Sequence, residues 1–170
     1  FKKMKKIKFF FKILRKFLFS VIWYEAVNSK KITKKNYRLV VLKSKKNFLR
    51  FSKKNYFSIK KYKLKRFSKK IYLLLLVKRK KILSSGWIFY GKKWKITEID
   101  VSVNLNKTLL LFDFETPQSL RNKGYYTMLL KLIKNRFIEK RLAIYTLSYN
   151  LKSRRGIEKA GYKFIKKIYA

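Results

Sequence analysis

The chain has 170 residues, 48% of them hydrophobic, which suits one domain with a single core. It has no cysteine and no histidine, so disulfides, thiolate catalysis, Cys-based metal sites and the commonest general base are excluded. Any acid–base chemistry must use carboxylates, tyrosines, lysines, a terminus or water. No bound metal is expected.

The formal charge of +41 suggests a polyanionic partner at first sight. However, 38 of the 48 basic residues are lysine and only 10 are arginine, although arginine binds phosphate better. Lys, Ile, Phe, Tyr and Asn are abundant while Pro, Ala and Gly are scarce, as an AT-rich genome would produce in any protein. We therefore favour compositional bias as the main source of the charge, and a nucleic-acid partner is not favoured.

At the N-terminus, apolar residues between Phe9 and Tyr24 follow a broad helical stripe. We interpret this stripe as the first helix of the domain, packed on a sheet. The alternative is peripheral membrane contact through residues 1–24. No apolar run approaches the roughly 20 residues that span a bilayer, and no signal-peptide cleavage pattern follows. We therefore expect a cytoplasmic protein.

Residues 1–70 are the least readable part of the chain. In this part, short apolar runs at Tyr37–Leu42, Asn47–Phe51 and Tyr56–Ile59 lie between clusters of Lys, Ser and Asn. They are typical of short strands or of a strand–loop–helix segment.

From Ile71 onward the pattern predicts an antiparallel meander. Its expected strands are Ile71–Lys78, Ile82–Tyr90, Trp94–Val103 and Thr108–Phe114. The first of these is continuously apolar, as a strand covered on both faces would be.

After Pro117 the pattern changes to alternating helices and strands. Met128, Leu129, Leu132 and Ile133 give one apolar stripe to a helix from Gly124 to Phe137. A strand at Leu142–Leu147, a helix at Ser153–Ala160 and a strand at Tyr162–Tyr169 complete the expected order. The fold class is therefore mixed α/β (α+β), with a mostly antiparallel central sheet flanked by helices, in a single domain over residues 1–170.

The stretch from Thr116 to Tyr162 carries the chemistry. Arg121-Asn122-Lys123-Gly124-Tyr125-Tyr126 comes directly before the predicted helix. Unpaired amides and the helix dipole at such a start favour phosphate. A second block, N-L-K-S-R-R-G-I-E-K-A-G-Y, runs from Asn150 to Tyr162.

Together, in this order, the two blocks resemble the acyl-CoA-binding core of the GCN5-related N-acetyltransferase superfamily over residues 71–170. The family's pyrophosphate loop reads Q/R-x-x-G-x-G/A, so Arg121 and Gly124 match while Tyr126 replaces a small residue. The bulky Tyr126 side chain must then point away from the phosphates.

The resemblance implies acetyl-CoA as acyl donor, an amine as acceptor and direct transfer between them. It assigns CoA binding to the following residues: Arg121, Asn122, Lys123, Gly124, Tyr125, Tyr126, Thr127, Asn150 and Ser153. Asn150 is expected either to cap the next helix or to bond the pantetheine arm. Members of the family usually have a seventh strand after the sixth. This sequence ends soon after its sixth expected strand, so we expect the seventh to be absent or to be supplied by a partner chain.

Four of the seven acidic residues lie between positions 98 and 115 and supply candidates for the general base. Glu115 is the first choice because it ends the strand beside the CoA loop, Asp113 is the second, and Glu98 and Asp100 complete the group. Many family members have an acidic tyrosine seven residues after the asparagine, where this chain has Ile157. Tyr162, Tyr145 or Tyr149 would have to replace that tyrosine.

The sequence therefore predicts an N-acetyltransferase that acts on an amine, such as a sugar amine or another small molecule. The alternative is a non-catalytic protein of the same fold that binds RNA or the ribosome, since lysines alternate with aromatics at Lys60-Lys61-Tyr62-Lys63. The acceptor and the oligomeric state stay open.

Overall fold

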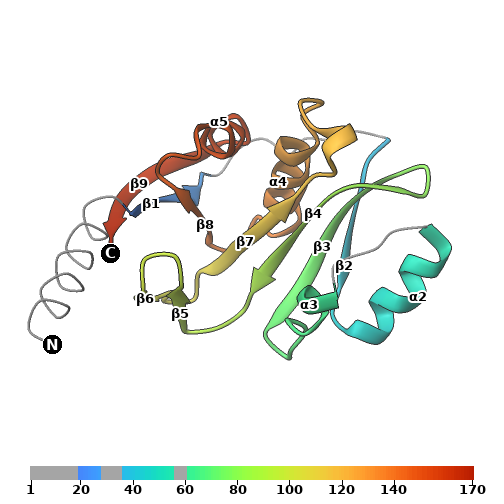
Figure 1. Ribbon diagram of the computed structural model, residues 1–170, viewed down its shortest axis with the longest axis horizontal. Coiled ribbons are helices and arrows are strands. Elements are labelled where there is room, and N and C mark those ends of the chain that lie inside the picture. The colour runs from blue at the N-terminus through green and yellow to red at the C-terminus, as the bar shows by residue number, and fades with distance from the viewer. Residues whose placement is uncertain (1–18, 28–35, 56–60) are drawn as a thin grey trace, which may run out of the picture.

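The computed structural model describes residues 19–27, 36–55 and 61–170. Described strands form a seven-stranded sheet in the order β2-β3-β4-β7-β8-β1-β9 and a separate β5-β6 pair (Figure 1). The strands are β1 Ser20–Ala26, β2 Arg38–Leu42, β3 Ile71–Lys78, β4 Lys81–Phe89, β5 Lys93–Ile96, β6 Val101–Asn104, β7 Leu109–Glu115, β8 Leu142–Leu147 and β9 Tyr162–Tyr169. The helices are α2 Lys45–Asn55, α3 Lys61–Leu64, the 3-10 turn η1 Gln118–Leu120, α4 Tyr125–Arg136 and α5 Leu151–Lys159. The expected mixed α/β class with a mostly antiparallel sheet is confirmed.

The large sheet is covered on both faces, which explains the continuous apolar run of β3. Leu74 and Leu76 belong to the core cluster under α4 and α5. Leu73 and Leu75 point to the opposite face, where they share a second cluster with Phe48 of α2. Alternate side chains of a strand point to opposite faces, so every position of a doubly covered strand is apolar.

The prediction of an N-terminal helix over Phe9–Tyr24 is wrong from Ser20 onward, because the chain forms strand β1 there. Residues 1–18 lie outside the described part. Val21 packs on one face of the sheet and Tyr24 on the other, and both are fully buried. β-Branched and aromatic residues favour such a doubly buried strand over a helix with one apolar stripe.

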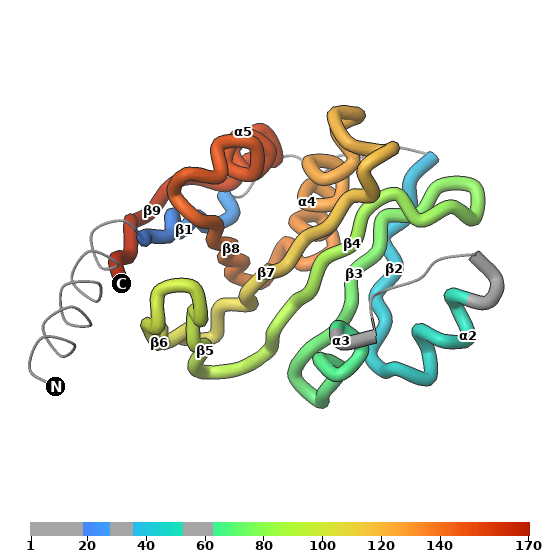
Figure 2. Tube along the Cα trace, viewed as in Figure 1, coloured from blue at the N-terminus to red at the C-terminus, as the bar shows by residue number. Residues whose placement is uncertain are grey.

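Strand β1 also supplies the seventh strand of the sheet. It pairs antiparallel with β8 on one side and with β9 on the other, so segments from opposite ends of the sequence lie side by side (Figure 2). The expectation that this strand would be absent or would come from a partner chain was wrong.

The expected strand Trp94–Val103 is instead a hairpin outside the main sheet. Residues 97–100 form a turn between β5 and β6, and Asp100 has a left-handed φ of 58°. Aspartate tolerates this conformation, which most residues avoid. The hairpin interrupts the expected meander, and β4 pairs directly with β7.

The remaining expected elements agree closely with the structure. Asn47–Phe51 lies within helix α2, which Ser44 caps by accepting a hydrogen bond from the Asn47 amide at 3.2 Å. Strands β3, β8 and β9 have the expected bounds, while the run Tyr56–Ile59 lies outside the described residues. Among the helices of the described ranges, none is both long enough and apolar enough to cross a bilayer.

Candidate functional site

A cleft opens where β7 and β8 separate. These parallel strands pair only from Leu109 to Leu111 with Leu142 to Ile144, and beyond that point they diverge. Asp113 has a φ of 46°, and the register of β4 and β7 shifts beside it, so a bulge turns β7 away from β8. The resulting cleft has a volume of about 940 Å3 and is lined by both strand ends and by the starts of α4 and α5.

The N-terminus of α4 lies at this cleft. Gly124 precedes the helix with a φ of 75°, and no side chain caps the first amides. A Cβ built on Gly124 meets no atom within 4 Å, so the space above it is open. Unsatisfied amides and the helix dipole make this position suited to an anion.

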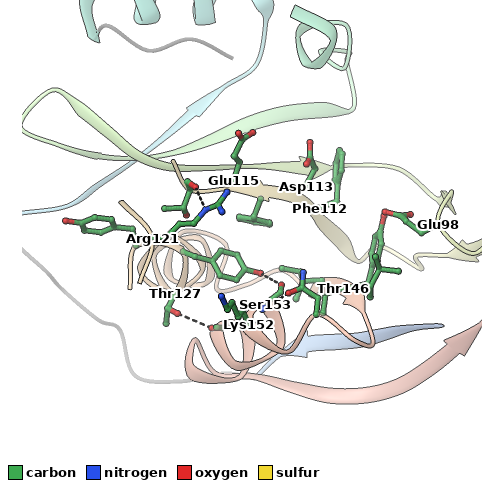
Figure 3. A pocket seen from close by; sticks show the side chains of 18 of the residues that line it. Glu98, Phe112, Asp113, Glu115, Arg121, Thr127, Thr146, Lys152 and Ser153 are labelled. Atoms are coloured by element: carbon green, nitrogen blue, oxygen red, sulfur yellow. Dashed lines mark hydrogen bonds between the residues drawn. The ribbon is translucent and has the colours of Figure 1, made fainter. Parts of the chain in front are cut away.

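The loop before α4 is held by short local contacts. Arg121 donates from Nε to the carbonyl oxygen of Thr116 at 3.2 Å (Figure 3). Of the residues expected to bind CoA, those that line the cleft are Arg121, Asn122, Gly124, Tyr125, Tyr126, Thr127, Asn150 and Ser153. Lys123 is not part of this lining.

Tyr126, which replaces the family's small residue, fills the seam between α4 and α5. Its ring packs against Phe114 with centroids 5.3 Å apart, and its hydroxyl lies 3.3 Å from the Ser153 hydroxyl. Burial raises the pKa of the Tyr126 phenol, so the phenol stays protonated at neutral pH. The ring fits because Gly156 on α5 has no side chain.

We expect Gly156→Ala to destabilise the protein, because the added Cβ would lie 2.7 Å from the Tyr126 ring. Overpacking costs about 1–3 kcal/mol, against a helix-propensity gain of up to about 1 kcal/mol. The double variant Gly156→Ala with Tyr126→Ala should be more stable than the sum of the single effects predicts. Denaturant unfolding of all four proteins measures this coupling, and additive effects would contradict the contact.

The second block starts helix α5 as expected. The Asn150 side chain accepts a hydrogen bond from the Ser153 amide at 3.1 Å, so its capping role is confirmed. Lys152 also lines the cleft and was missed in the sequence, although it lies inside the N-L-K-S motif. A lysine at this position adds positive charge where a phosphate-bearing ligand would enter.

Asp113 and Glu115 line the cleft from β7 (Figure 3), and the carboxylates of both residues form ion pairs with basic side chains. Lys63, only 7% exposed, places its Nζ 2.7 Å from Glu115 and 3.2 Å from Asp113. Arg66 forms an ion pair with Asp113. These contacts tie the segment around α3 to β7. The sequence presented Lys63 only as part of a run of lysines and aromatics, and nothing in it predicted the ion pairs of Lys63 and Arg66 with β7.

We expect Lys63→Met to lower the free energy of unfolding by about 1–3 kcal/mol. Breaking a fully buried pair costs about 3–5 kcal/mol, but Asp113 and Glu115 keep 30% and 48% of their side chains exposed, so solvent screens the loss. Methionine keeps the apolar stem, and Lys65→Met, at an exposed position of the same segment, is the control. Urea denaturation checks the difference, and equal stabilities of the two variants would refute it.

Tyr162 lies in the core rather than at the cleft. It is 2% exposed and donates a hydrogen bond to the Leu130 carbonyl at 3.4 Å. Burial raises its pKa, which keeps the phenol neutral. Its burial follows from its position after Gly161, which turns the chain from α5 into β9 beneath α4. The structure therefore gives Tyr162 a packing role in the core, near Tyr126, and does not place it in the lining of the cleft.

Instead, the end of the cleft near β5 holds Tyr145, Trp94 and Glu98. Trp94 donates from its indole nitrogen to the Tyr145 hydroxyl at 3.4 Å, and the Tyr145 ring stacks on Trp23 at 6.5 Å between centroids. Burial raises the pKa of Tyr145 to about 12, and nearby Glu98 contributes to the rise. Within the described residues no group of three or more potential metal ligands is present.

No family model matches the chain, and no curated protein matches its sequence. Solved structures do match its fold. A GNAT-family acetyltransferase from Colwellia psychrerythraea aligns with a TM-score of 0.57 at 13% identity, covering 89% of this chain and 54% of that one. A GCN5-related N-acetyltransferase from Kribbella flavida gives 0.53 at 8% identity, covering 88% and 56%. A GCN5-related N-acetyltransferase-like protein from Streptococcus suis gives 0.50 at 9% identity, covering 95% and 65%.

These similarities show that the chain has the GCN5-related N-acetyltransferase fold, as the sequence resemblance implied. At identities of 8–13% they establish the fold alone. The chain spans 54–65% of the length of these three structures.

Proposed function

We propose that the protein is an acyl-CoA-dependent N-acyltransferase that transfers an acetyl group from acetyl-CoA directly to a primary amine. One observation carries the proposal: the uncapped start of α4 lies at the cleft between two diverging parallel strands. The amides suit an anionic pyrophosphate, and the cleft continues from them to the diverging ends of β7 and β8, where an attached thioester would lie.

The donor half of the cleft takes the CoA moiety. The amides after Gly124 bind the pyrophosphate, and the nearby side chains of Arg121, Asn122 and Lys152 supply charge and hydrogen bonds. The remaining proposed CoA contacts are Lys123, Tyr125, Tyr126, Thr127, Asn150 and Ser153. Because the Asn150 oxygen already caps α5, a contact with pantetheine would use its amide nitrogen.

The acceptor half lies at the other end of the cleft. Three carboxylates line the cleft, those of Glu98, Asp113 and Glu115; Glu98 lies at the end away from Arg121, whereas Glu115 lies nearer to Arg121 (Figure 3). A carboxylate beside the acceptor attracts an ammonium group and accepts its proton. The aromatic rings of Trp94 and Phe112, with centroids 4.5 Å apart, add an apolar surface to the lining of the cleft. Aromatic and carboxylate groups together suit a small amine such as an amino sugar.

The net charge of +41 assists donor capture, because a positive field speeds association with polyanionic CoA. The same field attracts every other polyanion, so binding alone at low salt is a poor test of function.

A transfer assay tests the proposal. The protein is incubated with acetyl-CoA and a panel of primary amines, including amino sugars, and thiol release is measured together with the mass of the acetylated product. We expect thiol release that depends on one class of amine. Binding of acetyl-CoA without transfer to any amine would contradict the enzymatic proposal, and salt-sensitive RNA binding in its place would favour the non-catalytic alternative.

A further inference from the structure

Tyr145 lies at the point where the two strands separate. Leu111 and Ile144 are the last paired residues of β7 and β8, so Phe112 and Tyr145 are the first residues beyond the pairing. Both line the cleft. A thioester that enters from the α4 side has its reacting carbon at this apex, since the cleft narrows to the paired strands there.

Tyr145 faces away from helices α4 and α5. It packs with the clusters on the opposite face of the sheet, beside Trp94 and Trp23. Figure 3 shows Arg121 toward one end of the cleft, which we call the donor end, and Glu98 toward the opposite, acceptor end. Tyr145 lies on the acceptor side of the point where the strands separate, with Trp94 and Glu98.

The Tyr145 hydroxyl is held by neighbours on several elements. Trp94 of β5 donates to it at 3.4 Å, and the Trp94 ring is fixed against Phe89 and Phe112 with centroids 4.9 Å and 4.5 Å away. Glu98, in the turn after β5, lies near enough to the hydroxyl to raise the pKa of Tyr145, whereas the positive charge of Arg66, after α3, acts to lower it. A partly buried phenol that accepts one hydrogen bond still has its own proton to donate.

Glu98 differs from the other two carboxylates of the cleft. Asp113 and Glu115 share the buried Lys63, and Asp113 also contacts Arg66. Glu98 accepts a hydrogen bond from the Thr97 hydroxyl at 3.3 Å and forms no ion pair with any described residue. Its exposed carboxylate can therefore accept a proton without first releasing a cation.

From this arrangement, and resting on the proposed function, we infer that Glu98 and Tyr145 are the proton acceptor and the proton donor for acyl transfer to a primary amine. The amine nitrogen forms the C–N bond to the thioester carbonyl carbon and loses a proton to Glu98. The C–S bond breaks, its electron pair stays on sulfur, and sulfur takes the Tyr145 proton. Glu98 then returns its proton to the Tyr145 oxygen, so both residues are restored and the products are an amide and free thiol.

The test uses two small amines with saturating acetyl-CoA. After ethylamine attacks the thioester carbonyl, its nitrogen needs a general base to remove the proton. Methoxyamine is weakly basic, so the nitrogen of its adduct is acidic enough to lose the proton to water. We expect Glu98→Gln to slow transfer to ethylamine by about 10²–10⁴-fold and transfer to methoxyamine far less. Tyr145→Phe should slow both amines alike, because the leaving thiolate is the same. The exposed residues Glu139 and Tyr169 give matched controls, and Glu139→Gln and Tyr169→Phe should leave both rates unchanged.

The opposite outcomes overturn the assignment. Equal losses for both amines in Glu98→Gln would indicate a structural role, and an ethylamine-selective loss in Asp113→Asn would move the base to Asp113. An unchanged rate in Tyr145→Phe removes the proton donor. If the wild-type protein binds acetyl-CoA but transfers to neither amine, this end of the cleft is no amine site. Failure to bind acetyl-CoA would instead contradict the proposed function itself.

Discussion

Gly124→Val is expected to lower the affinity for acetyl-CoA by at least about tenfold, or ~1.4 kcal/mol. The φ of 75° at Gly124 belongs to the left-handed region, which a β-branched residue adopts at a cost of about 1–2 kcal/mol. The new side chain would also extend into the open space above the α4 amides, where the pyrophosphate is proposed to bind. Calorimetric titration with acetyl-CoA measures the loss.

Gly124→Asn separates these two effects. Asparagine tolerates the left-handed region, as Asn122 with a φ of 62° already does in the same loop. The Gly124→Asn variant should have the same unfolding free energy as the wild type. It should nevertheless bind acetyl-CoA more weakly than the wild type, because its side chain lies over the same amides. Wild-type affinity in both variants would show that the start of α4 does not hold the donor.

Tyr24→Ala is expected to lower the free energy of unfolding by about 3–5 kcal/mol, as for other large-to-small changes of buried aromatics. Tyr24 is fully buried in strand β1, between β8 and β9, and its hydroxyl connects this strand to α5. Its hydroxyl donates to Glu158 at 3.0 Å and accepts from Arg154 at 3.3 Å. A loss of this size approaches the whole stability of a typical domain.

Tyr24→Phe keeps the ring and removes only these hydrogen bonds. It should cost about 1–3 kcal/mol, because both partners are charged groups. Urea unfolding of both variants gives the two values. A loss below about 1 kcal/mol for Tyr24→Ala would contradict the position of β1 inside the sheet.

Much of the fold from Ile71 onward could be predicted because its signals are local. The run Ile71–Lys78 is apolar throughout, and Gly161 ends α5 with a left-handed φ of 84°. The positions of Gly124 and Asn150 at the starts of two helices could be predicted for the same reason, since a helix start depends on a few adjacent residues. Both flank the cleft as expected.

What could not be predicted depends on contacts distant in sequence. The strand character of Ser20–Ala26 comes from pairing with β8 and β9, more than a hundred residues away, and a broad apolar stripe fits a helix equally well. Lys63 is 50 residues from Asp113, so no local pattern predicted that these two residues form an ion pair. Tyr145 was one of three alternatives until the separation of β7 and β8 placed it at the apex.

The shift in unfolding temperature with acetyl-CoA at elevated salt tests the central claim most directly, with ATP and heparin as polyanion controls. At a hundredfold excess over the dissociation constant, a specific ligand adds ~2.7 kcal/mol, which raises the midpoint of a domain of this size by about 5–10 °C. We predict a saturable shift with acetyl-CoA that persists in salt and is at most about half as large in Gly124→Val. Equal shifts with all three polyanions, lost together in salt, would contradict an acyl-CoA site in this cleft.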